Sequence, residues 1–171
     1  MNYAEIRRVD VANGPGVRVS LFVSGCPHHC EGCFNPETWD FQFGTVFGEE
    51  QTAQILQWLR PAHIQGLSLL GGEPFAPENQ QMVLELVRRV RQELPEKDIW
   101  CYTGYLFEAL RDGMIGAYSR ELLEELDILV DGPFVLSRKN LGLRFRGSDN
   151  QRIIQVKQSF CTGEVCFWEE G

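Results

Sequence analysis

Three cysteines, Cys26, Cys30 and Cys33, follow one another with the spacing C-x3-C-x2-C. Thiolates in short-spaced runs of this kind are typical ligands of iron–sulfur clusters, which usually take four per cubane. A fourth protein ligand is not obvious in this loop. If only three arrive, one iron keeps an open coordination position, where a ligand can bind and react.

Two other interpretations of the same loop stay open. A structural zinc site of the Cys3His type could recruit His28 or His29. Such motifs usually consist of two short-spaced ligand pairs, and no second pair matches this one. Disulfides are disfavoured because the N-terminus does not resemble a signal peptide and cytosolic thiols stay reduced. The spacing therefore favours a cluster over zinc, and zinc over unrelated thiols.

The elements around the loop predict how the cysteines are positioned. Residues 1–16 are polar and end in the turn cluster NGPG, and the β-branched, apolar run 17–23 predicts a buried strand that leads into the loop. Further strands are expected at 66–70, 99–102, 128–130 and 153–156, with an added piece at 165–168, and helices at 49–60, 77–94, 106–110 and 120–126.

Strands that alternate with helices indicate parallel βαβ units of an α/β protein. A complete eight-fold barrel needs about 250 residues, so 171 residues can form only part of one. We expect an open partial (β/α) barrel of about five to six mostly parallel strands. Its active site should lie at the C-terminal ends of the strands.

Composition limits the function classes. With 43% hydrophobic residues, the chain is expected to form a single domain over 1–171, with a cluster loop at 25–35 and a tail at 158–171 of uncertain role. The net charge of −8 argues against nucleic acid as a partner. The chain has no apolar run of membrane-spanning length, and we expect a cytoplasmic protein.

The motif and its surroundings resemble a known family. A C-x3-C-x2-C loop after a first strand is typical of the radical S-adenosylmethionine superfamily, and the flanking residues resemble the activating proteins of anaerobic ribonucleoside-triphosphate reductase. The matching segments are NGPGVR at 13–18, LFVSGC at 21–26, CEGCFN at 30–35, GGEP at 71–74, YTGY at 102–105, VDG at 130–132 and RGSDNQ at 146–151. Gly32, before the third cysteine, separates this family from the wider superfamily.

This resemblance implies a [4Fe-4S] cluster on Cys26, Cys30 and Cys33, with S-adenosylmethionine at the open iron. The residues expected to bind the cofactor are Gly32, Phe34, Gly71, Gly72, Glu73, Pro74, Thr103 and Asp131. Glu73 would accept hydrogen bonds from the methionine ammonium. Taken alone, GGEP could be only a turn that ends a strand, and Asp131 could instead cap the turn before Pro133.

The implied activity is that of a radical oxidoreductase. An electron from a low-potential donor such as flavodoxin or ferredoxin cleaves S-adenosylmethionine, and the 5′-deoxyadenosyl radical takes hydrogen from a glycine of the reductase. Activation of another glycyl-radical enzyme, such as pyruvate formate-lyase, is the nearest enzyme alternative. A zinc-stabilised interaction module is the alternative that is not an enzyme.

The remaining polar and thiol groups carry weaker expectations. Arg146, Ser148 and Asn150 lie either in a solvated turn or at a surface that docks the reductase. Cys101, inside a predicted strand, is expected to be a small buried hydrophobe. Cys161 and Cys166, in the tail, are expected to be ordinary thiols rather than a second metal site or a redox pair.

Overall fold

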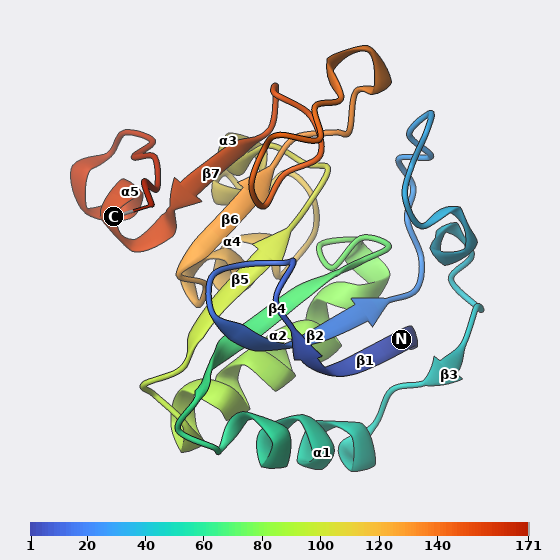
Figure 1. Ribbon diagram of the computed structural model, residues 1–171, viewed down its shortest axis with the longest axis vertical. Coiled ribbons are helices and arrows are strands. Elements are labelled where there is room, and N and C mark those ends of the chain that lie inside the picture. Colours follow the sequence, from blue (N-terminus) through green and yellow to red (C-terminus); the bar gives the residue numbers. More distant parts are fainter. Residues whose placement is uncertain (171) are drawn as a thin grey trace.

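The computed structural model describes residues 1–170, which form a seven-stranded sheet of order β3-β1-β2-β4-β5-β6-β7 (Figure 1). The strands are β1 (Asn2–Asp10), β2 (Val17–Val23), β3 (Thr45–Val46), β4 (Ile64–Gly71), β5 (Asp98–Tyr102), β6 (Ile128–Asp131) and β7 (Arg152–Gln155). The helices are α1 (Glu49–Leu59), α2 (Pro77–Glu93), α3 (Phe107–Arg111), α4 (Ser119–Glu124) and α5 (Val156–Thr162), with 3-10 turns at Pro36–Trp39 and Leu136–Arg138.

The sheet is open and mixed. β2, β4, β5 and β6 run parallel in its centre, whereas β1, β3 and β7 pair antiparallel at its two edges. The predicted α/β class is confirmed, but a mostly parallel partial barrel of five to six strands is not. At β7 the difference arises because no α-helix separates it from β6, so the chain returns along the same edge in the opposite direction.

Alternation along the strands divides the core into two faces. One face packs against the helices through the main apolar cluster, to which β2 contributes Val19, Leu21 and Val23. The other face carries a smaller cluster around Trp100, Ile128 and Val130. The predicted strands and helices in the first 131 residues are confirmed within two residues at their boundaries.

β1 is the longest of the elements that the sequence analysis missed, which also include β3 and α5. Its polar pattern, NYAEIRRVD, resembles a leading segment rather than a strand, because only Tyr3 and Ile6 pack against the main core. β1 nevertheless pairs with both β2 and β3. The 165–168 segment also joins the sheet, through an isolated bridge between Ile154 and Phe167. None of the helices within residues 1–170 has the length and hydrophobicity to cross a membrane.

A buried arginine ties the NGPG turn to the sheet. The Arg18 side chain is fully buried, and its Nε donates to Ser68 Oγ at 2.7 Å. Its Nη2 donates to the Leu67 carbonyl at 3.0 Å and to Asp98 Oδ1 at 2.5 Å, and its Nη1 donates to the Pro15 carbonyl at 3.1 Å. The guanidinium therefore fixes the turn against the face of the sheet opposite the helices.

Asp10 forms a second anchor for the same turn. Burial alone would raise the pKa of this carboxyl, but hydrogen bonds from Ser20, Asn13 and the Ala12 amide outweigh it, and the pKa is lowered from its ordinary value. Ser68 Oγ also donates to the Asn13 carbonyl at 2.5 Å. Both anchors hold residues 10–16 in one conformation.

We predict that Arg18→Met lowers the free energy of unfolding by about 2–4 kcal/mol, measured by urea denaturation. The substitution keeps the apolar stem but leaves buried acceptors without their donor. Arg88→Met is the control, because Arg88 pairs with Glu121 on an exposed surface, where ion pairs contribute little. Equal losses in both variants would contradict an anchoring role for Arg18.

Candidate functional site

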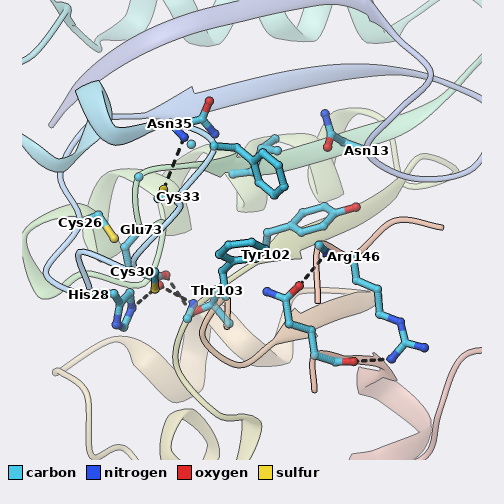
Figure 2. A pocket seen from close by; sticks show the side chains of 18 of the residues that line it. Asn13, Cys26, His28, Cys30, Cys33, Asn35, Glu73, Tyr102, Thr103 and Arg146 are labelled. Atoms are coloured by element: carbon cyan, nitrogen blue, oxygen red, sulfur yellow. Dashed lines mark hydrogen bonds and ion pairs between the residues drawn. The ribbon is translucent and has the colours of Figure 1, made fainter. Parts of the chain in front are cut away.

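A cavity of about 500 Å³ opens at the C-terminal ends of the parallel strands, in the size range of small-molecule sites. Its walls come from two loops that leave the same end of the sheet, residues 24–44 and 132–151 (Figure 1). All three cysteines of the C-x3-C-x2-C loop line it, together with Gly71, Gly72, Glu73 and Thr103 (Figure 2). The structure thus brings together motifs that are about 75 residues apart in the sequence.

Backbone hydrogen bonds hold the cysteine loop in place. The Gly25 amide donates to the Thr38 carbonyl at 2.7 Å, and the Cys26 amide donates to the Trp39 carbonyl at 3.2 Å. Burial raises the pKa of the Cys26 thiol to about 11. A thiol must lose its proton to bind metal, so binding at Cys26 releases a proton at neutral pH.

Gly71 and Gly72 are required by the close approach of backbone. Gly71 has a φ of +112°, and a Cβ there would lie 2.6 Å from the backbone nitrogen and oxygen of Val23. A Cβ on Gly72 would lie 2.6 Å from the Gly25 carbonyl oxygen. The Glu73 amide donates to that same carbonyl at 2.7 Å. The two glycines therefore let the turn after β4 pack against the start of the cysteine loop.

The Glu73 carboxylate joins three loops. It is fully buried, and its Oε1 accepts hydrogen bonds from His28 Nε2 and the Gly104 amide, both at 2.7 Å. Its Oε2 accepts from the Phe75 amide at 2.9 Å and from Thr103 Oγ1 at 2.8 Å. A carboxylate has about four lone-pair sites, so these four donors occupy all of them.

We predict that Glu73→Gln lowers the melting temperature of the cofactor-free protein by about 3–10 °C. Whichever way the new side-chain amide turns, its NH2 group faces the backbone N–H of Gly104 or Phe75. Two donors then face each other without an acceptor, which costs about 1–3 kcal/mol. Glu85→Gln, on the exposed side of α2, is the control and should melt with the wild type. Identical melting of both variants would show that the buried hydrogen bonds do not hold the loops.

The side chains of the loop do not converge on a single metal ion. His28 donates to Glu73 and packs edge-on against Tyr105, with ring centroids 4.5 Å apart. His29 stacks on Trp39 at 4.6 Å. Within residues 1–170, no three His, Cys, Asp or Glu side chains are close enough to hold a single metal ion. The donor set is soft sulfur around a cavity, which fits an iron–sulfur cluster.

Phe34 lines the mouth of the cavity. Its side chain is 58% exposed, with its ring 5.1 Å from that of Phe134 and the Lys139 ammonium 5.3 Å from its centroid. Gly32 does not line the cavity, and a Cβ there would lie 2.7 Å from Leu136 Cδ1. Gly32 thus allows the cysteine loop to approach the opposite wall, whereas Phe34 offers an apolar face.

Of three other residues expected at the site, only Thr103 lines the cavity, whereas Asp131 and Pro74 do not. Thr103 lines the cavity, although its hydroxyl donates to Glu73. Asp131 does not line it: the fully buried carboxylate accepts from the Phe107 amide at 2.8 Å and pairs with Arg152, its neighbour on β7. Pro74 is buried behind the turn and does not line the cavity. Asp131 is therefore structural in this arrangement.

The 146–151 segment is held by internal hydrogen bonds. Ser148 is fully buried, and its Oγ accepts from the Val135 amide at 3.2 Å. Arg146 Nη1 donates to the Gln151 carbonyl at 2.6 Å, and Asn150 Nδ2 donates to the Pro133 carbonyl at 2.8 Å. These contacts form the wall of the cavity, which Arg146 lines. Of Arg146, Ser148 and Asn150, the first and last are half-buried, and Asp149 beside them is exposed.

The structure adds cavity residues that the sequence analysis did not select. Asn13, Phe22, Leu70 and Tyr102 line the cavity from the sheet and the NGPG turn. Period-two alternation could have indicated Phe22 and Leu70, which point away from the helices. Cys101 is fully buried, as predicted, and burial raises its pKa.

Comparison with known proteins decides the family. The family described as a 4Fe-4S single cluster domain matches residues 12–154. An anaerobic ribonucleoside-triphosphate reductase-activating protein of Vibrio cholerae is 45% identical, over 90% of this chain and 97% of its own. This chain belongs to the family of these reductase-activating proteins.

Other activating proteins match to the same extent. The one from Escherichia coli is 44% identical over 92% of this chain and 100% of its own, and the one from Pasteurella multocida is 42% identical over 92% and 99%. The resemblance to this family that the sequence analysis identified is therefore confirmed. The description of the family as a 4Fe-4S domain also agrees with the three thiols that line the cavity.

Proposed function

We propose that this protein is a radical S-adenosylmethionine enzyme that installs a glycyl radical on anaerobic ribonucleoside-triphosphate reductase. The observation that carries the proposal is the meeting of Cys26, Cys30 and Cys33 with the GGEP turn around one cavity. When bound, the cluster passes one electron to S-adenosylmethionine, which yields methionine and a 5′-deoxyadenosyl radical that takes a hydrogen atom from the glycine α-carbon. A flavodoxin or ferredoxin supplies the electron.

The residues of the chain bind and orient the cofactors. The thiolates of Cys26, Cys30 and Cys33 would hold the cluster, and a cubane bound by only three thiolates would have one iron available to the cofactor. Phe34 presents its exposed ring to the adenine. The methionine ammonium binds Glu73, and it must replace one of the four donors already there. His28 and Thr103 are the two donor side chains that line the cavity. His28 is the more exposed of the two, so we propose that the ammonium takes its place.

Access to the cavity fits a protein substrate. Phe34 and Leu141 at its mouth are 58% and 86% exposed, an apolar rim that a partner could cover. A partner seated there would also exclude water from the radical. Cluster binding also requires that the three cysteines stay reduced, which leads us to propose the cytoplasm as the site of action.

The ligand set is tested by iron content. Changing Cys26, Cys30 or Cys33 singly to Ala should abolish a four-iron cluster reconstituted anaerobically, because each supplies one of only three anchors. Cys161→Ala and Cys166→Ala are matched controls in the tail and should keep their iron. Loss of iron in a tail variant, with retention in any loop variant, would reverse the assignment.

The activity is tested with reductase whose glycine carries deuterium at the α-carbon. After mixing reduced protein, S-adenosylmethionine and this reductase, we expect a glycyl signal by electron paramagnetic resonance and deuterium in 5′-deoxyadenosine. Transfer of the label requires direct abstraction by the cofactor-derived radical.

Two outcomes separate the alternatives. Signal on pyruvate formate-lyase but none on the reductase would favour the other class of activase. Formation of 5′-deoxyadenosine with neither label nor glycyl signal would reject a protein substrate.

A further inference from the structure

The cavity has two chemically distinct ends. The cysteines, His28, Glu73 and Thr103 gather at one end, whereas the Tyr102 ring points away from them, toward the side where Asn13 and Arg146 lie (Figure 2). We call this second region the tyrosine end, defined by Asn13, Phe22, Leu70, Tyr102 and Arg146. Nothing in the cofactor chemistry proposed above uses it.

The Tyr102 hydroxyl is the unexplained group of the tyrosine end. It is buried and has no hydrogen-bond partner within residues 1–170. Burial raises the pKa of Tyr102 far above its ordinary value, so the phenol stays neutral and can donate. A buried polar group without a partner costs stability, and its retention at a cavity wall indicates a partner that comes from outside.

Asn13 supplies the complementary acceptor. Its Nδ2 donates to Asp10 Oδ2 at 2.7 Å, and because a carboxylate only accepts, this bond fixes which way the amide turns. Asn13 Oδ1 then has no donor within residues 1–170 and is available to the cavity that Asn13 lines. The anchors at Arg18 and Asp10 hold the turn rigidly, so Oδ1 is preorganised.

The cations near this end have contacts of their own. Arg7 pairs with Glu5 at 3.0 Å, and its guanidinium lies 4.5 Å from the centroid of the Phe22 ring. Arg146 donates to the Gln151 carbonyl. Tyr102 and Asn13 themselves offer a neutral donor and a neutral acceptor over an apolar floor, which match an uncharged group that has one acceptor and one donor.

We propose that Tyr102 and Asn13 bind the backbone of one residue in the partner's extended segment, with Tyr102 O–H donating to its carbonyl and Asn13 Oδ1 accepting from its N–H. In an extended strand the carbonyl and the N–H of one residue point to the same side, and a glycine has no Cβ to keep the backbone from the floor of Phe22 and Leu70. The proposal rests on the proposed function, and it makes both residues positioning residues for the glycine α-carbon.

The test is Tyr102→Phe in the full chain with reconstituted cluster. The readout is the number of glycyl radicals formed per 5′-deoxyadenosine. We expect this ratio to fall about threefold to tenfold, as the loss of one hydrogen bond predicts. Tyr118→Phe, at the start of α4 and outside the cavity lining, is the matched control and should keep the wild-type ratio.

Thermal unfolding of Tyr102→Phe supplies a second readout. Because the hydroxyl lacks an internal partner, its removal should leave the melting temperature equal or higher. A lower melting temperature would reveal an internal partner and overturn the inference.

The remaining outcomes are separable. A wild-type ratio in Tyr102→Phe, or parallel loss of both products at constant ratio, would overturn the peptide contact while the proposed function stands. Absence of 5′-deoxyadenosine from the wild type would instead reject the proposed function, and this inference with it.

Discussion

A single buried carboxylate determines how the cofactor end of the cavity is assembled. Glu73 accepts hydrogen bonds from the turn after β4, the turn after β5 and the cysteine loop. A carboxylate buried without donors is strongly unfavourable, so the three segments are stable together only when all of the donors are in place. Gly71 and Gly72 permit this arrangement because they let the backbones of β4 and the cysteine loop touch.

The opposite end of the cavity is held by a buried arginine that donates to several acceptors, rather than by a carboxylate that accepts. There the polar groups belong to a network beneath the NGPG turn, in which Arg18 reaches Ser68, Leu67, Pro15 and Asp98. The network is fully satisfied, whereas the Tyr102 hydroxyl above it is not. Well-bonded groups fix the walls, whereas Tyr102 lines the cavity with its hydroxyl still able to take a partner.

Much of this arrangement could be predicted from the sequence, since local patterns determine it. The apolar stripe of α2 and the run of β2 give their elements directly. Long-range pairing could not be predicted. The polar strand β1 is stabilised by neighbours on both sides, and the antiparallel direction of β7 places Arg152 beside Asp131. That pairing turns an expected cofactor ligand into a buried ion pair. Likewise, the cysteine motif identifies the thiols, but nothing local indicates that Tyr102 lacks a partner.

The two walls of the cavity have a consequence for biosynthesis. Gln151, at the end of the second wall, follows Cys33 by 118 residues. At typical rates of translation, roughly 6–24 s pass between the emergence of Cys33 and that of Gln151. During this interval the thiols lie on a nascent chain that has no opposite wall to shield them. Reducing conditions are therefore needed at the ribosome, well before any cluster is in use.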